Sequence, residues 1–149
     1  MSEDAEAAAL PRAVLLDTCA VIWLANGSGM AEAAVAAIVH AGLADGVFVS
    51  PVSAWEVGLL GRPSQTKPVN FLPDPKTWFA RVMAGPAIKP APFTPEIAID
   101  SSYLPGNLHG DPADRLIIAT ARQFGVPVVT RDARIRAYAE AGHVRVIPC

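Results

Sequence analysis

The sequence has too few cysteines for a disulfide framework or a cysteine-based zinc site. Cys19 and Cys149 are its two cysteines, and neither forms a CxxC pair. We expect Cys19 to be a small buried hydrophobe. The three histidines, His40, His109 and His143, show no ligand spacing, and we expect surface or capping roles for them rather than catalytic ones.

Long apolar stretches are also missing. No apolar run reaches the roughly 18 residues that would span a bilayer, and the acidic segment before Arg12 lacks the basic start of a secretory signal. We therefore expect a cytoplasmic protein with no membrane association. The 149 residues are 52% hydrophobic and 17% charged, which predicts one domain with an ample core. Its predicted bounds are 12–149, after a flexible tail at 1–11.

Motifs of several common enzymes are incomplete or missing. The glycine-containing segment 26–30 follows a predicted helix, and Glu32 stands where a dinucleotide-binding loop needs its third glycine. There is no P-loop, and no serine lies in a nucleophile elbow. A receiver domain would need an acid pair after the first strand and a late lysine. Asp17 has no acidic neighbour, and no lysine follows Lys89.

Four short apolar runs predict buried strands, at 13–16, 47–49, 126–129 and 144–147. Such continuous runs are typical of a parallel sheet that is covered on both faces. Helices are predicted at 20–24, 31–41, 52–60, 75–84, 95–104, 112–124 and 133–141. This alternation predicts an α/β fold, a three-layer α/β/α sandwich with a mostly parallel central sheet. The Pro- and Gly-rich stretches 61–73 and 85–95 are predicted to be ordered loops.

The net charge of −2 is unevenly distributed. Residues 1–60 and 92–114 together hold eleven acids and one base, whereas 61–91 and 115–149 are basic. Two basic stretches beside an acidic centre would suit a protein that cleaves phosphodiesters. Ordinary solvated faces explain the same pattern equally well.

Two acids stand at the ends of predicted strands. Asp17 directly follows the run 13–16, and Asp132 follows the run that ends at Val129. Ligands of open α/β sheets bind just beyond the carboxyl ends of the strands, so both positions favour chemistry. Asp17 also suits a helix N-cap, which is a purely structural role.

Two predicted helices carry further acids. Glu56 lies beside an apolar stripe of Val52, Trp55 and Leu59, where an acid is rarely buried without a partner or a metal. Asp111 is a natural N-cap before Pro112, and Asp114 lies in the first turn, from where it can point at the sheet edge. Arg115 could pair with an acid or contact phosphate.

Folding can bring these acids into one crevice, where they would repel one another unless a cation neutralised them. Hard oxygen ligands favour Mg²⁺ or Mn²⁺ over zinc or copper. Such a site activates water for hydrolysis of a phosphodiester and requires no side-chain nucleophile.

In order along the chain, these motifs resemble the PIN domain, in particular the VapC-like toxins of type II toxin–antitoxin systems. The resemblance runs from about Val14 to Ile147 and rests on the segments 16–18, 92–98, 104–106, 111–115 and 130–132 and on the helix of Glu56. It implies a Mg²⁺- or Mn²⁺-dependent endoribonuclease, a homodimer, and an antitoxin that occupies the active-site groove. The implied catalytic and metal-binding acids are Asp17, Glu56, Asp114 and Asp132. Asp111 is a less certain metal ligand, and Thr18 and Thr130 would support the site by hydrogen bonds.

Two alternatives remain open. A similar acid cluster could cleave DNA, and a PIN-like scaffold could bind RNA or a protein without catalysis. Loss of one acid would favour the second alternative, and all four acids are present.

Overall fold

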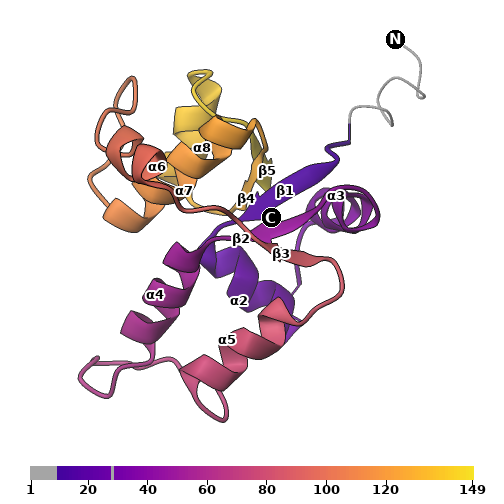
Figure 1. Ribbon diagram of the computed structural model, residues 1–149, viewed down its shortest axis with the longest axis vertical. Coiled ribbons are helices and arrows are strands. Elements are labelled where there is room, and N and C mark those ends of the chain that lie inside the picture. Colours follow the sequence, from indigo (N-terminus) through magenta and orange to yellow (C-terminus); the bar gives the residue numbers. More distant parts are fainter. Residues whose placement is uncertain (1–9, 28) are drawn as a thin grey trace.

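A five-stranded parallel sheet forms the centre of the protein (Figure 1). The computed structural model describes residues 10–27 and 29–149, so most of the predicted tail, residues 1–9, lies outside the described residues. The strand order is β3-β2-β1-β4-β5, and all neighbouring pairs are parallel. The strands are β1 Ala13–Leu16, β2 Gly46–Val49, β3 Ile88–Pro90, β4 Val128–Thr130 and β5 Val146–Pro148.

Helices cover both faces of this sheet. They are α2 Thr18–Asn26, α3 Glu32–Leu43, α4 Pro51–Leu60, α5 Pro75–Met83, α6 Pro95–Asp100, α7 Pro112–Phe124 and α8 Ala133–Glu140. Val14 and Leu16 pack with residues of α2 and α3 on one face, while Leu15 packs with α7 on the other. Side chains alternate between faces because of the strand pleat. The predicted three-layer α/β/α sandwich with a parallel sheet is confirmed.

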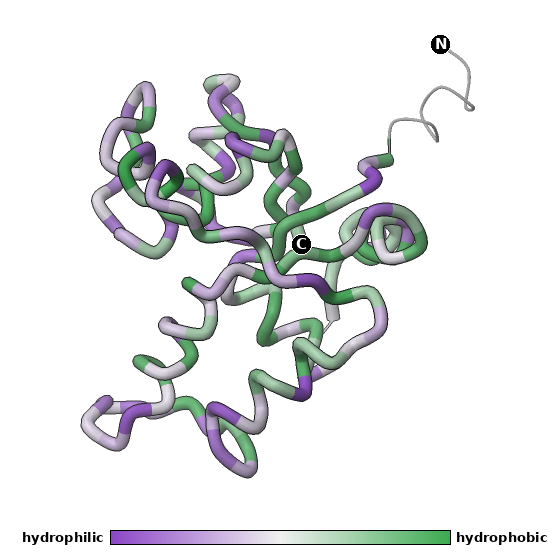
Figure 2. Tube along the Cα trace, viewed as in Figure 1, coloured by the Kyte–Doolittle hydropathy of each residue, from purple (hydrophilic) through white to green (hydrophobic). Residues whose placement is uncertain are grey.

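The central strands are the most hydrophobic part of the core (Figure 2). Val14, Leu15 and Leu16 are at most 1% exposed. Burying a side chain of this size stabilises the fold by about 1.5–3 kcal/mol, and both faces of β1 contribute. This explains why the strand reads as a continuous apolar run. Within the described residues, no helix has the length and apolar character needed to cross a membrane.

Two elements differ from the prediction by more than shifted bounds. The stretch 85–95, predicted to be a loop, contains β3, which pairs with β2 at the edge of the sheet. The strand is not recognisable in the sequence because it contains Lys89 and Pro90. Proline cannot donate a hydrogen bond to a β-ladder and is confined to edge strands. The helix predicted at 95–104 ends at Asp100, where the N–H groups of Ser102 and Tyr103 bond to carbonyls three residues back and close the helix in tight turns.

Three helices begin at the carboxyl edge of the sheet, just after its inner strands. Asp17 caps α2 after β1, Ser50 caps α4 after β2, and Asp132 caps α8 after β4. Since β2, β1 and β4 are adjacent and parallel, these three helix starts lie along one edge. In open α/β sheets this is the edge where ligands bind.

Candidate active site

Asp17 lies deepest at this edge and is 6% exposed. Its Oδ1 accepts a hydrogen bond from the backbone N–H of Ala20 at 2.8 Å, which caps α2. Burial raises the pKa of Asp17 to about 6; hydrogen bonds from Thr130 and Ala20 oppose this, and the charges of Asp114 and Asp132 add to it. The helix-cap role is therefore confirmed, and the same carboxylate is also held in an unfavourable charged state.

Glu56 lies at the same carboxyl edge and comes from α4. The Thr18 hydroxyl donates a hydrogen bond to Oε1 of Glu56 and lies 3.0 Å from the hydroxyl of buried Ser53. Burial raises the pKa of Glu56; the bond from Thr18 lowers it, and the charges of nearby acids, Asp114 first, raise it further. Thr18 thus orients the carboxylate without neutralising it.

The buried face of α4 differs from the predicted stripe. Val52, Ser53 and Val57 are buried, whereas Trp55 is 51% exposed. Ser53 is accommodated in the interior because its hydroxyl pairs with that of Thr18. This rotation of the helix brings Glu56 to α2 and leaves Trp55 on the surface.

Asp111 and Asp114 stand at the start of α7. The exposed Asp111 is the N-cap, and its Oδ1 accepts a hydrogen bond from the N–H of Asp114 at 3.1 Å. The Asp114 side chain is 17% exposed, and its Oδ2 lies 2.7 Å from Nε2 of His109. Burial raises the pKa of Asp114; the His109 hydrogen bond lowers it, and the charges of Asp111 and Asp132 raise it. Asp111 therefore caps the helix, and its charge also acts on the site.

Asp132 caps α8, two residues after β4. Its Oδ1 accepts hydrogen bonds from the N–H groups of Arg134 at 2.8 Å and Ile135 at 3.2 Å, and its Oδ2 pairs with the Arg134 guanidinium at 3.1 Å. Burial raises the pKa of Asp132, but the hydrogen bonds from Arg134 and Ile135 outweigh it, and the net pKa is lowered. The hydroxyl of buried Thr130 accepts a hydrogen bond from the N–H of Asp132 and also acts on Asp17.

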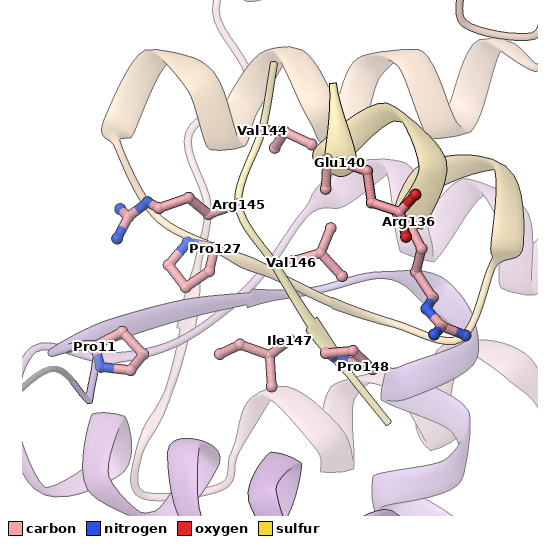
Figure 3. Close-up of a pocket in the computed structure, with 10 residues that line it drawn as sticks. Pro11, Pro127, Arg136, Glu140, Val144, Arg145, Val146, Ile147 and Pro148 are labelled. Carbon is pink, nitrogen blue, oxygen red and sulfur yellow. The ribbon is translucent and has the colours of Figure 1, made fainter. Parts of the chain in front are cut away.

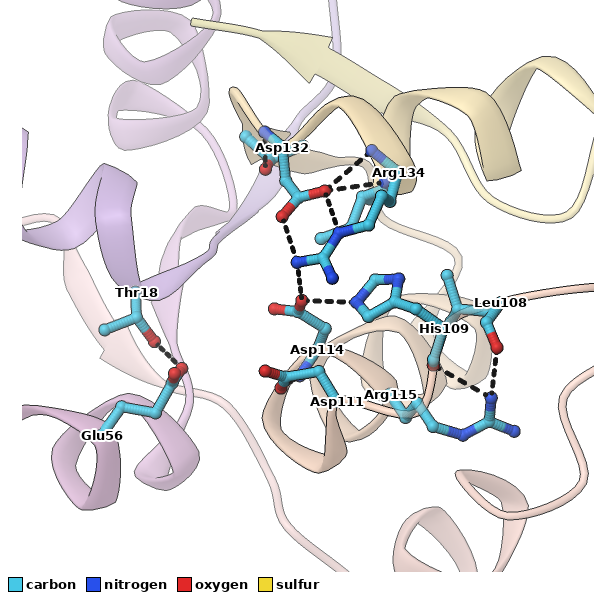
Figure 4. A network of polar contacts seen from close by, with 11 residues as sticks. Thr18, Glu56, Leu108, His109, Asp111, Asp114, Arg115, Asp132 and Arg134 are labelled. Carbon is cyan, nitrogen blue, oxygen red and sulfur yellow. Dashed lines mark hydrogen bonds and ion pairs between the residues drawn. The ribbon is translucent and has the colours of Figure 1, made fainter. Parts of the chain in front are cut away.

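The acids from these elements influence one another across the edge (Figure 4). The Nη2 of Arg134 lies 3.1 Å from Asp132 Oδ2 and 3.9 Å from Asp114 Oδ2, so it links two of them directly. Within residues 10–27 and 29–149, however, no three Asp, Glu, His or Cys side chains are close enough together in this conformation to hold a metal ion. The acids share one edge of the sheet but do not form a closed cage.

The donor chemistry of this edge fits a hard divalent cation. In the described part of the chain, neither Asp17 nor Glu56 forms an ion pair. Burial, followed by the charges of nearby acids, raises the pKa of both, so their charged forms are unfavourable without a cation. Carboxylate oxygens are the ligands that Mg²⁺ and Mn²⁺ prefer. Bringing all four acids around one ion requires side-chain movement, because His109 contacts Asp114 and Arg134 pairs with Asp132.

Two residues around Asp114 lie differently from the prediction. His109, expected at the surface or as a cap, has a side chain that is only 15% exposed and contacts Asp114. Arg115, expected to pair with an acid or to contact phosphate, donates to the carbonyls of Ser101 and Leu108 instead. Consecutive helical residues are turned by about 100°, so Arg115 faces the preceding loop while Asp114 faces the sheet edge. The sequence feature that could have indicated this contact is the position of His109 just before the acidic start of α7.

Cys19 is exposed, so the prediction of a buried hydrophobe is wrong. It lies in the first turn of α2, next to Asp17. Partial burial raises the pKa of its thiol to about 11, and the charges of the four predicted acids, Asp17 first, add to this rise. Because the thiolate is the reactive and metal-binding form, this acidic field favours the less reactive protonated thiol.

A separate pocket of about 520 Å³ lies beside β5 (Figure 3). Its walls include Pro127, Val146 and Ile147, with Arg136 and Glu140 among its polar residues. None of the predicted acids lines it. The predicted acids therefore lie at the open carboxyl edge and not in this pocket.

Comparison with known proteins agrees with this geometry. Residues 14–141 match the PIN domain family. Ribonuclease VapC22 of Mycobacterium tuberculosis is 32% identical over 126 residues, which cover 84% of this chain and 91% of that protein. The similarity extends through all the elements that carry the acids.

Solved structures share the fold at lower identity. The VapBC2 structure from Rickettsia felis, bound to a promoter DNA fragment, has a TM-score of 0.65 at 12% identity and covers 91% of this chain and 98% of its own. DNA-bound VapBC from Salmonella typhimurium has a TM-score of 0.57 at 17% identity and covers 91% of this chain and 96% of its own. The predicted resemblance is confirmed: the chain belongs to the PIN domain family and is a relative of the ribonuclease VapC22.

Proposed function

We propose that this chain is a divalent-metal-dependent endoribonuclease and the toxin of a toxin–antitoxin pair. The observation that carries the proposal is the acidic carboxyl edge, where burial and mutual repulsion raise the pKa values of Asp17, Glu56 and Asp114. The ribonuclease relative supports the activity, and the VapBC neighbours support the biological setting.

The proposed catalytic and metal-binding set consists of Asp17, Glu56, Asp114 and Asp132, with Asp111 beside it. When bound, Mg²⁺ or Mn²⁺ supplies a more acidic water and stabilises charge on phosphoryl oxygens. Thr18 orients Glu56 through its hydroxyl, and Thr130 acts on Asp17. Arg115 supports the site indirectly, because it fixes the loop that leads into α7.

RNA is proposed to approach over basic residues of α8 and of the loop at the far end of α4 (Figure 1). Arg62 and Lys67 are exposed in the loop after α4, and Arg134 reaches the acids themselves. Cationic side chains attract the phosphate backbone and offset its repulsion by the acids. These residues would guide RNA without reading its sequence.

Protein partners are also part of the proposal. Exposed apolar side chains include Leu43 at 86%, Trp55 at 51% and Leu72 at 72%. Exposed side chains of this kind are available for contact with other proteins. A second copy of the chain and a cognate antitoxin that occupies the active-site groove are the proposed partners, in the cytoplasm. Light scattering of the purified chain, alone and with the product of an adjacent gene, would measure both associations.

A cleavage assay tests the activity. Labelled RNA and single-stranded DNA of the same sequence are incubated with the purified chain in Mg²⁺, Mn²⁺ or EDTA, with Asp17→Asn as the matched control. We expect RNA cleavage in both metals and none in EDTA or with the variant.

The other outcomes identify the alternatives. Metal-dependent cleavage of DNA but not RNA would identify a deoxyribonuclease. RNA binding without cleavage in any metal would identify a non-catalytic scaffold. Cleavage that persists in EDTA would contradict the role of a divalent ion.

A further inference from the structure

The ring of His109 makes a single polar side-chain contact at the acidic edge. Its Nε2 lies 2.7 Å from Asp114 Oδ2, and the side chain is 15% exposed. Its Nδ1 is buried and has no hydrogen-bond partner within the described residues. Because an ionised carboxylate can only accept, Nε2 carries the proton in this contact. The ring is therefore aimed at Asp114.

The backbone of His109 is fixed by Arg115. Its Nη1 donates to the carbonyls of Leu108 at 3.1 Å and of His109 itself at 3.4 Å, while its Nε donates to Ser101 at 2.8 Å. A planar guanidinium presents its donors in fixed directions, so it ties the end of α6 to the loop before α7. The backbone that carries the imidazole is thus held in place by the protein itself.

His109 uses only one oxygen of Asp114. Figure 4 shows the other oxygen turned to the side on which Thr18 and Glu56 lie. Arg134 also approaches Oδ2, but at 3.9 Å and from a side chain that is 60% exposed, so it orders the carboxylate weakly. The contact that fixes the rotation of this carboxylate is the one from His109.

We propose that His109 is a positioning residue, whose Nε2–H holds Oδ2 of Asp114 so that the other oxygen faces the remaining acids. The inference rests on the proposed function, in which Asp114 binds a metal. Hydrogen bonds from neighbouring residues generally orient metal-binding carboxylates, and loss of such a partner lowers metal affinity by roughly 10–100-fold. His109 itself touches neither RNA nor the ion.

Substitution of His109 by glutamine or by asparagine distinguishes the roles of its two ring nitrogens. Glutamine places its amide nitrogen near the position of Nε2, whereas asparagine places its nitrogen near that of Nδ1. His143→Gln is the control, because His143 packs against Tyr138 with ring centroids 4.7 Å apart and has no acid partner in the described chain. Calorimetry measures Mn²⁺ affinity for each full-length, RNA-free variant, and circular dichroism in EDTA checks that each is folded.

We expect His109→Asn to weaken Mn²⁺ binding by roughly 10–100-fold, and His109→Gln to stay within about threefold of the unmodified chain. Raising the Mn²⁺ concentration should restore cleavage by His109→Asn at an unchanged KM for RNA, which a general loss of structure would not allow. In an Asp114→Asn background, His109→Asn should have no further effect on Mn²⁺ affinity.

Equal Mn²⁺ affinities for the unmodified chain and both His109 variants would overturn the inference and leave the proposed function standing. Equal losses with asparagine and glutamine would also overturn it, because the position of the donor would then be irrelevant. Additive effects of His109→Asn and Asp114→Asn would do the same. Failure of the unmodified chain to bind Mn²⁺ would overturn the proposed function and this inference together.

Discussion

The β1–α2 and β4–α8 corners place an aspartate in nearly the same setting with opposite electrostatic results. Asp17 and Asp132 both follow inner, adjacent parallel strands, and both cap the next helix. Burial raises the pKa of Asp17 to about 6, whereas the pKa of Asp132 is lowered by hydrogen bonds that outweigh its burial. The difference comes first from burial and then from the partners. Asp17 is 6% exposed and has a hydroxyl and an amide as partners, whereas the Asp132 side chain is 26% exposed and pairs with the Arg134 guanidinium.

This contrast shows which part of the site is left for a cation to complete. On the Asp132 side, Arg134 already neutralises charge and extends to Asp114. On the Asp17 side, Glu56 adds a second acid whose hydrogen-bond partner is the neutral Thr18. A divalent ion would therefore gain most of its favourable electrostatic energy from Asp17 and Glu56.

The largest effect should come from removing the uncompensated acid. Asp17→Asn keeps an oxygen for the helix cap but removes the charge, so we expect cleavage of RNA to fall by at least about 1000-fold, a loss of several kcal/mol. Asp114→Ala should be equally damaging. Initial rates at saturating Mn²⁺ measure this, with circular dichroism to confirm folding. Retention of most activity by the Asp17→Asn, Asp114→Ala double variant would refute the assigned site.

The same substitution should stabilise the metal-free protein. The folded-state pKa of Asp17, about 6, exceeds the ordinary 3.8. The contribution of Asp17 to the stability of the fold is therefore fully present below about pH 4, where the carboxyl is protonated, and is lost as the pH rises through 6. A shift of this size amounts to about 3 kcal/mol at neutral pH. Urea unfolding in EDTA should show Asp17→Asn to be more stable than the unmodified chain at pH 7.5 and equal to it near pH 4.

Asp132→Asn is the matched control for that experiment. The pKa of Asp132 is lower in the folded protein than in the unfolded chain. Its carboxylate therefore stabilises the fold at a pH above its unfolded-state pKa, and this stabilisation is lost as the pH falls through the folded-state pKa. Removing its charge should therefore destabilise the protein at pH 7.5, by at most about 1 kcal/mol because Arg134 is exposed. If both substitutions shift stability in the same direction, the contrast between the two corners is not electrostatic.

Mn²⁺ should stabilise the unmodified chain and hardly affect Asp17→Asn. At about 100 times its dissociation constant, a ligand that binds only the folded state adds about 2.7 kcal/mol. Thermal melts in Mn²⁺ and then in excess EDTA measure this gain and its reversal. An equal rise in Tm for Asp17→Asn would place the ion elsewhere.

The smallest effect concerns the basic surface outside both corners. Neutralising Arg62 and Lys67 together should weaken RNA binding and reduce its salt slope by about 1.4, since each phosphate contact to a single strand contributes about 0.7. Arg12→Gln is the control, because Arg12 pairs with Asp45 through exposed side chains. Fluorescence anisotropy at several salt concentrations measures the slope. An unchanged slope would show that these residues are merely solvated.

The sequence predicted the sheet and the acids better than the partners of those acids. Apolar runs such as 13–16 specify buried strands, and an acid directly after a strand has a position that topology alone determines. β3 escaped prediction because Lys89 and Pro90 interrupt the apolar run that marks the other strands, and an edge strand tolerates such residues.

The exposure of Cys19, the contact of His109 with Asp114 and the carbonyl contacts of Arg115 depend on how a helix is rotated and how a loop returns to it. Local spacing does not contain that information. The pairing of Thr18 with Glu56 joins residues 38 apart in the chain and likewise requires the fold.

Diffraction from crystals grown with Mn²⁺, recorded with its anomalous signal, would test most directly whether the acids of the carboxyl edge bind one ion together. We predict an anomalous peak coordinated by carboxylate oxygens of Asp17 and Glu56, with Asp114 or Asp132 completing the contacts, and its loss in Asp17→Asn crystals. A peak bound by one acid alone, or a peak unchanged in the variant, would contradict the account.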